Sequence, residues 1–230
     1  MFGYFGSKYR DAGLYQPPMF DVIVEPFAGA AAYAMHWLTL RTSARCVLIE
    51  KDPAIAALWR RLLAMEPADV LALPDVNAGD RCREPLVALC KAHPSKHAAE
   101  VFTVTDWIAP VWPHHRRRIA STLARVKGRV EIIEGDYTDA PTIEASWFID
   151  PPYQHQGHVY RHGSKGIDYQ ALAEWCRTRP GHVQVCESAP ADWMDFRHHH
   201  SHRTQSNVIT SELVWESHPP LTLFDERREQ

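Results

Sequence analysis

Asp150, Pro151, Pro152 and Tyr153 stand directly after a short apolar run, Trp147-Phe148-Ile149. Short apolar runs of this kind are typical of buried strands in a parallel sheet. In open α/β sheets, ligands bind beyond the carboxyl ends of the strands, where this tetrapeptide is expected to lie. The four residues are therefore the first candidates for catalysis.

The tetrapeptide suits the activation of an amino group attached to an aromatic ring. The exocyclic amine of a nucleic-acid base is a poor nucleophile because its lone pair is delocalised into the ring. The Asp150 carboxylate and the Pro151 carbonyl could each accept an N–H hydrogen bond and favour a pyramidal nitrogen. The two prolines stiffen the turn, and Tyr153 offers an aromatic face for stacking. Pro and Asp are also common in plain surface turns, but the position after a strand favours the catalytic reading.

Two further elements suit a nucleotide-like cofactor. Residues 25–29, Glu-Pro-Phe-Ala-Gly, follow the apolar run at 21–24, and a glycine there lets the backbone approach a ligand closely. Glu50 ends the next apolar run, at 44–49, and its carboxylate could accept both hydroxyls of a ribose. Either feature alone also fits an ordinary strand end.

Taken together and in this order, these elements resemble the amino-methylating DNA methyltransferases, in particular the DNA adenine methyltransferase branch. The resemblance implies S-adenosylmethionine as the cofactor and the Asp-Pro-Pro-Tyr residues 150–153 as the catalytic motif. Residues 4–8 resemble the family's N-terminal Tyr-Pro-Gly-Gly-Lys element, and Asp136-Tyr137 the pair that meets the cofactor adenine. The implied cofactor-binding residues are Tyr4, Gly6, Ser7, Lys8, Glu25, Pro26, Phe27, Ala28, Gly29, Glu50, Lys51, Asp136, Tyr137 and Asp150.

Three positions depart from the family pattern. Ala31 stands where the family usually has a second glycine, Phe5 replaces a proline, and Ser7 replaces a glycine. The added side chains bear on cofactor affinity more than on the type of reaction. Lys8 could reach the cofactor's methionine carboxylate or structure the loop, and the sequence leaves both roles open.

The pattern of elements predicts how the site is held. Strands are expected at 21–27, 44–52, 129–136, 146–152 and 182–188, followed by two final strands joined near 205–210. Helices are expected at 30–40, 53–65 and 168–178, with Pro53 at a first helical position and Asp168 as an N-cap. Alternating strands and helices predict an α/β fold: a Rossmann-like methyltransferase sheet of seven strands, the last antiparallel. Residues 1–65 and 128–230 are expected to form the catalytic domain.

Residues 66–127 break this alternation with six prolines and are predicted to form a small, mainly helical insertion with short helices. In the resembled branch the insertion recognises the target. The insertion carries a basic run, residues 114–118, near Trp107 and Trp112. Outside the insertion, a polar loop with further basic residues follows Tyr153. Phosphate contacts are therefore expected from His114, His115, Arg116, Arg117, Arg118, Arg161 and Lys165.

The expected reaction is site-specific methylation of adenine N6 in double-stranded DNA, with the target base flipped out of the stack. Cytosine N4 in DNA and adenine N6 in RNA stay open as substrates. Methylation of a protein glutamine would fit Asn-Pro-Pro-Tyr better than the Asp150 motif. A catalytically inactive, nucleic-acid-binding relative is the alternative from a different class.

Composition sets the broader limits. The chain has 230 residues, a formal net charge of −3 and five cysteines without a Cys-x-x-Cys pair, which argues against a disulfide framework. His198, His200 and His202 alternate, but neither they nor the region of Cys82 and Cys90 has the ligand set of a metal site, so none is expected. No apolar run approaches bilayer length, and a cytoplasmic monomer is expected.

Overall fold

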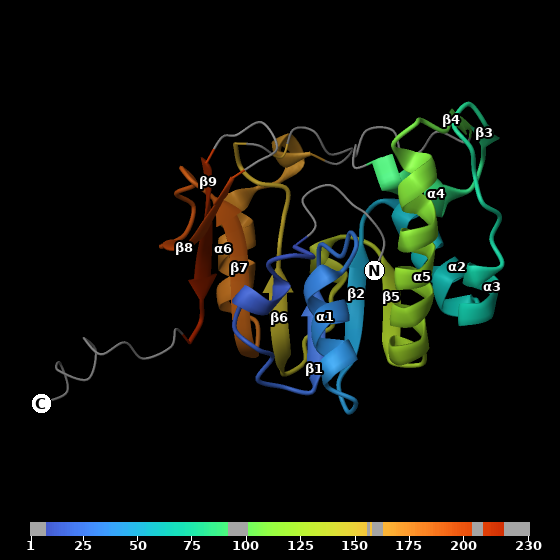
Figure 1. The fold of residues 1–230 in the computed structure, drawn as a ribbon. Coiled ribbons are helices and arrows are strands. Elements are labelled where there is room, and N and C mark those ends of the chain that lie inside the picture. Colours follow the sequence, from blue (N-terminus) through green and yellow to red (C-terminus); the bar gives the residue numbers. More distant parts are fainter. Residues whose placement is uncertain (1–7, 92–100, 156, 158–162, 204–208, 219–230) are drawn as a thin grey trace, which may run out of the picture.

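A seven-stranded sheet forms the centre of the protein (Figure 1). The computed structural model describes residues 8–91, 101–155, 157, 163–203 and 209–218. The strand order is β5-β2-β1-β6-β7-β9-β8. The strands are β1 (Val22–Glu25), β2 (Arg45–Glu50), β5 (Val130–Glu134), β6 (Ala145–Ile149), β7 (Gly181–Ser188), β8 (Arg197–Arg203) and β9 (Ile209–Glu216).

The strand directions confirm the predicted fold class. β1 pairs in parallel with β2 and β6, β2 with β5, and β6 with β7. β9 lies antiparallel to both β7 and β8, so it alone opposes the other strands of this sheet. The α/β, Rossmann-like arrangement with an antiparallel last strand is therefore present, and all seven strands lie where the sequence predicts them.

The helices cover both faces because the strands are apolar on both sides. Ile23 of β1 belongs to one core cluster and the next residue, Val24, to the other. The main helices are α1 (Ala32–Leu40), α2 (Pro53–Ala64), α5 (Ile108–Val126) and α6 (Tyr169–Arg177). The first three contribute to the first cluster and α6 to the second. The predicted caps are present: Pro53 begins α2, and the Asp168 carboxylate accepts from the Ala171 N–H.

The segment between α2 and β5 differs from its prediction in one respect. It contains α3 (Pro67–Leu71), β3 (Arg81–Cys82), α4 (Pro85–Ala88), β4 (Phe102–Thr103) and the 19-residue α5, so the expectation of short helices alone was wrong. Pro110 lies in the first turn, where an N–H has no partner within the helix, so only Pro113 interrupts the ladder.

The same segment shares the core of the sheet domain. Leu86 of α4 and Trp112 of α5 are fully buried in one cluster with Leu38 of α1. The division into a catalytic domain and a target-recognition insertion therefore stays a prediction. One-turn 3-10 helices complete the described fold: η1 (Ala12–Leu14), η2 (Leu89–Lys91), η4 (Tyr137–Asp139) and η6 (Ser164–Gly166). In the part of the chain that the structure describes, no helix combines the length and apolar character needed to cross a bilayer.

Candidate active site

Asp150 is the first residue beyond β6, at the carboxyl end of the sheet's central strands. Its carboxylate lies 3.5 Å from the Lys8 ammonium, and its side chain is 22% exposed. Burial raises the pKa of Asp150 to about 6, and the neighbouring Lys8 charge opposes that rise. The group is therefore an accessible carboxylate at neutral pH, as an acceptor of amine N–H groups must be.

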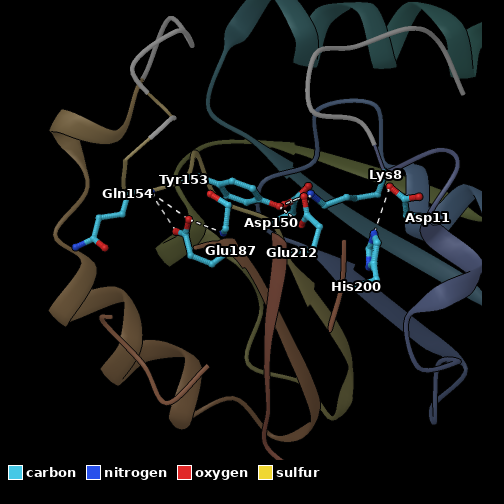
Figure 2. A network of polar contacts seen from close by, with 9 residues as sticks. Lys8, Asp11, Asp150, Tyr153, Gln154, Glu187, His200 and Glu212 are labelled. Atoms are coloured by element: carbon cyan, nitrogen blue, oxygen red, sulfur yellow. Dashed lines mark hydrogen bonds and ion pairs between the residues drawn. The ribbon is translucent and has the colours of Figure 1, made fainter. Parts of the chain in front are cut away.

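Lys8 joins Asp150 to Tyr153 of the same tetrapeptide and to Glu212 of β9 (Figure 2). Its ammonium donates to the Tyr153 hydroxyl and, over 3.1 Å, to Glu212 Oε2. The Tyr153 hydroxyl donates to the same Glu212 oxygen over 2.7 Å. Burial disfavours the charge of Lys8, but the Asp150 and Glu212 carboxylates outweigh it and raise the pKa of the ammonium. Of the two roles that the sequence left open for Lys8, these contacts support the structural one.

The turn after β6 is held at several points. The Pro152 carbonyl accepts from the Tyr169 hydroxyl over 2.5 Å, and the Tyr153 carbonyl accepts from the Gly157 N–H over 2.6 Å. A Cβ on Gly157 would lie 2.7 Å from the Pro152 carbonyl carbon, so only glycine fits there. Pro151 is buried, and these contacts hold the two residues that follow it.

Glu187 at the end of β7 secures the same turn. Its carboxylate accepts from the backbone N–H groups of Gln154 and Ser188, at 3.1 and 3.0 Å, and from the Trp193 indole at 3.1 Å. Burial raises the pKa of Glu187 to about 7. The prediction from sequence missed Glu187 and Glu212. The available signal was an acid on the buried face of a strand, since Glu212 alternates with buried Val214.

The loop after β1 is built around Gly29 and Ala31, which both have left-handed backbones with φ of +46° and +47°. Glu50 holds this loop: one carboxylate oxygen accepts from the Gly29 N–H and the other from the Asp52 N–H, both over 2.8 Å. Burial raises the pKa of Glu50 to about 7, against these two hydrogen bonds. A carboxylate offers about four acceptor positions, so Glu50 retains acceptor capacity for a ligand hydroxyl.

Most of the remaining predicted cofactor residues contact other parts of the fold, and the others lie outside the described residues. Glu25 is buried and accepts from the Ala34 N–H, so it caps α1; burial raises its pKa to about 8. Phe27 stacks on Tyr137 with ring centroids 5.6 Å apart, beyond the ends of β1 and β5. Lys51 pairs with Asp136 over 2.5 Å. The predicted residues Tyr4, Gly6, Ser7 and Arg161 lie outside the described residues.

These positions suit S-adenosylmethionine. Glu50 ends β2, Phe27 and Tyr137 follow β1 and β5, and Asp150 follows β6. These four strands are contiguous in the sheet. The remaining acceptor capacity of Glu50 suits a ribose hydroxyl, and the aromatic pair suits an adenine. Pro26 and Ala28 belong to the same turn, and the Ala28 N–H donates to the Ile49 carbonyl over 3.0 Å. The donor set fits the cofactor that the sequence predicts.

The members of the basic run on α5 differ in their contacts. Arg116 is internal: it donates to the Leu73 carbonyl and pairs with Asp75 over 2.8 Å. Arg118 lies over the Tyr9 ring at 4.5 Å and beside His115, whose pKa burial lowers to about 4. His114, Arg117 and Lys165 are exposed.

A groove of about 280 Å³ runs between α1 and α5 beside these arginines. Its described lining contains Arg118 and Arg125 but no carboxylate. His36, Ser121 and Thr122 add further polar groups. An anion such as a phosphate therefore suits this groove.

Comparison with known proteins gives structural likenesses only. No protein-family model matches the chain, and no curated protein matches its sequence. A precorrin-6y C5,15-methyltransferase from Geobacter metallireducens GS-15 has a TM-score of 0.39 at 11% identity, covering 84% of this chain and 79% of the other. A SAM-dependent methyltransferase from Aquifex aeolicus has a TM-score of 0.37 at 7% identity, covering 89% and 86%. Likenesses this distant assign neither a family nor a substrate.

Proposed function

We propose that this protein transfers a methyl group from S-adenosylmethionine to the N6 amine of an adenine in double-stranded DNA. The observation that carries the proposal is the folded Asp150-Pro151-Pro152-Tyr153 turn at the carboxyl end of β6. There, an accessible Asp150 carboxylate lies next to a stiff, hydrogen-bonded turn. Gly29 of the cofactor loop follows β1, and Glu50, which accepts from its N–H, ends the adjacent strand β2 of the same sheet.

The residues act on the amine rather than on the methyl donor. Asp150 accepts one amine N–H and the Pro151 carbonyl accepts the other, which localises the nitrogen lone pair. Bound S-adenosylmethionine would supply an electrophilic methyl carbon to the nitrogen lone pair, and its sulfur would keep the electron pair of the broken S–C bond. Asp150 then takes the surplus proton from nitrogen, because its raised pKa makes it a better base than a solvated aspartate.

The amine can reach Asp150 only after the base leaves the stack, so the mechanism requires base flipping. We propose that phosphates lie along the α1–α5 groove and contact Arg118, Arg125 and the exposed Arg117 of α5. Arg116 is left out of this contact because Asp75 and Leu73 already bind it.

The test uses methyl-labelled S-adenosylmethionine and unmethylated double-stranded DNA, followed by digestion to nucleosides. Label in N6-methyldeoxyadenosine is expected. Asp150→Asn should abolish it, whereas the same change at exposed Asp106 should leave it unchanged. Label in N4-methyldeoxycytidine would keep the mechanism and change the base. No label in DNA or in RNA would refute the proposed function.

A further inference from the structure

We propose that Glu212 is a positioning residue of this site: from the antiparallel strand β9 it fixes Tyr153 and holds Lys8, and through Lys8 it acts on Asp150. The inference rests on the proposed function, because it assigns a role within the same site. Glu212 belongs to neither the tetrapeptide nor the cofactor loop.

The geometry places Glu212 at the junction of three chain segments (Figure 2). One of its oxygens accepts from both the Lys8 ammonium, at 3.1 Å, and the Tyr153 hydroxyl, at 2.7 Å. Glu212 is 4% exposed and Lys8 is 6% exposed, so water screens these contacts little. Two hydrogen bonds to one rigid strand therefore fix the tip of the Tyr153 ring and the place of the ammonium.

Neutralising Lys8 does not by itself require Glu212. Asp150 already lies 3.5 Å from the ammonium, and burying a second carboxylate is costly. Two carboxylates sharing one ammonium leave the group of Lys8, Asp150 and Glu212 with a net negative charge. Glu212 therefore competes with Asp150 for Lys8 and makes Asp150 more basic, which suits a residue that must take up a proton.

Other groups near Asp150 do not share this geometry. Cys186 on β7 stays a neutral thiol, because burial raises its pKa well above the ordinary value, and burial does the same for Tyr153. Glu25 is bound to the Ala34 N–H of α1, and Glu187 to the Ser188 N–H of β7. Among the described residues, the charged and titratable groups that interact with Asp150 are Lys8, Tyr15, Glu25, Tyr153, Cys186, Glu187 and Glu212.

Removing the charge of Glu212 and removing that of Lys8 should shift the titration of Asp150 in opposite directions. In Glu212→Gln the ammonium pairs with Asp150 alone, so Asp150 should lose its proton at lower pH than in the wild type. In Lys8→Met the compensating charge is gone, so Asp150 should lose its proton at higher pH. A merely structural loss of packing gives no reason for shifts of opposite sign.

The experiment follows the ¹³Cγ chemical shift of Asp150 against pH in full-length protein labelled at aspartate, with Asp150→Asn as the assignment control. Glu216→Gln is the matched variant, because Glu216 is also a buried acid of β9 but pairs with Arg197. We expect a lower midpoint in Glu212→Gln, a higher one in Lys8→Met, and no change in Glu216→Gln.

Methyl transfer gives the second readout. With a pKa of about 6, roughly a quarter of Asp150 is ionised at pH 5.5. The rate at pH 5.5 relative to pH 8 should therefore rise about twofold in Glu212→Gln if the midpoint falls to about 5.5.

An unchanged Asp150 titration in folded Glu212→Gln would overturn the inference. If that variant does not fold, a titration in Lys8→Met that fails to move upward overturns it instead. Wild-type protein that methylates no base counts against the proposed function alone, because the ¹³C titration needs no catalysis.

Discussion

Glu50→Gln tests the cofactor site most directly. In the wild type, one carboxylate oxygen accepts from the Gly29 N–H and the other from the Asp52 N–H, each over 2.8 Å. A glutamine has the same shape but only one oxygen, and its NH₂ group must face one of these two donors. The change therefore removes one charge-assisted hydrogen bond and half of the acceptors proposed for the ribose.

The expected magnitude follows from this count. A hydrogen bond to a charged group contributes about 1.5–3 kcal/mol. One such bond lost to the ribose weakens binding of S-adenosylmethionine on the order of ten- to a hundredfold, since about 1.4 kcal/mol corresponds to tenfold in Kd. The effect on the free energy of unfolding without cofactor should be smaller. The substitution also removes a buried carboxyl group, and its pKa is already raised to about 7 because burial disfavours the charge.

Isothermal titration calorimetry with S-adenosylmethionine measures the loss, and thermal unfolding without cofactor reports the fold. Glu134→Gln is the matched control. Glu134 lies opposite Glu50 across the β2–β5 pair but is 41% exposed and pairs with Arg60 at the surface. Its substitution should leave Kd unchanged, because exposed ion pairs contribute about 0–1 kcal/mol. A folded Glu50→Gln that binds within about twofold of the wild type would refute the ribose assignment.

Three further predictions concern catalysis, stability and substrate binding. The methylation rate should fall as the pH drops through about 6, because protonation removes the Asp150 acceptor; a pH–rate profile that stays flat from pH 5 to 8 contradicts this. Ala31→Val should lower the free energy of unfolding, measured in urea, by about 2–3 kcal/mol, since a β-branched side chain fits poorly at a buried position with φ of +47°. Ala31→Gly should change this free energy by less than about 1 kcal/mol. Equal effects of the two substitutions would contradict the backbone argument. Arg118→Ala and Arg125→Ala should each reduce the salt dependence of DNA binding by about one counterion, measured in titrations at several salt concentrations. Arg116→Ala should mainly lower the melting temperature, because Arg116 pairs with Asp75. The reverse pattern would place the DNA elsewhere.

The sequence alone determined the strands of the large sheet, the helices α1, α2 and α6, and the position of Asp150 at a strand end. These features depend on local signals: apolar runs for β1, β2, β5, β6 and β7, Pro53 at the start of α2, and Asp168 as the cap of α6. Local signals also located Gly29 and Glu50 after their strands, since parallel strands bring such ends to one edge. The length of α5 was not predicted, because Pro110 and Pro113 obscured a helix that packing against α1 supports.

Only the tertiary structure decided which side chains meet. Glu212 lies 204 residues from Lys8 and 59 from Tyr153, and no periodicity links positions so far apart. The same holds for Arg116, which reads as part of an exposed basic run but is bound by Asp75 across the fold. Residue type and spacing predict which groups stand at strand ends, whereas charge compensation and burial depend on segments that only the folded chain brings together.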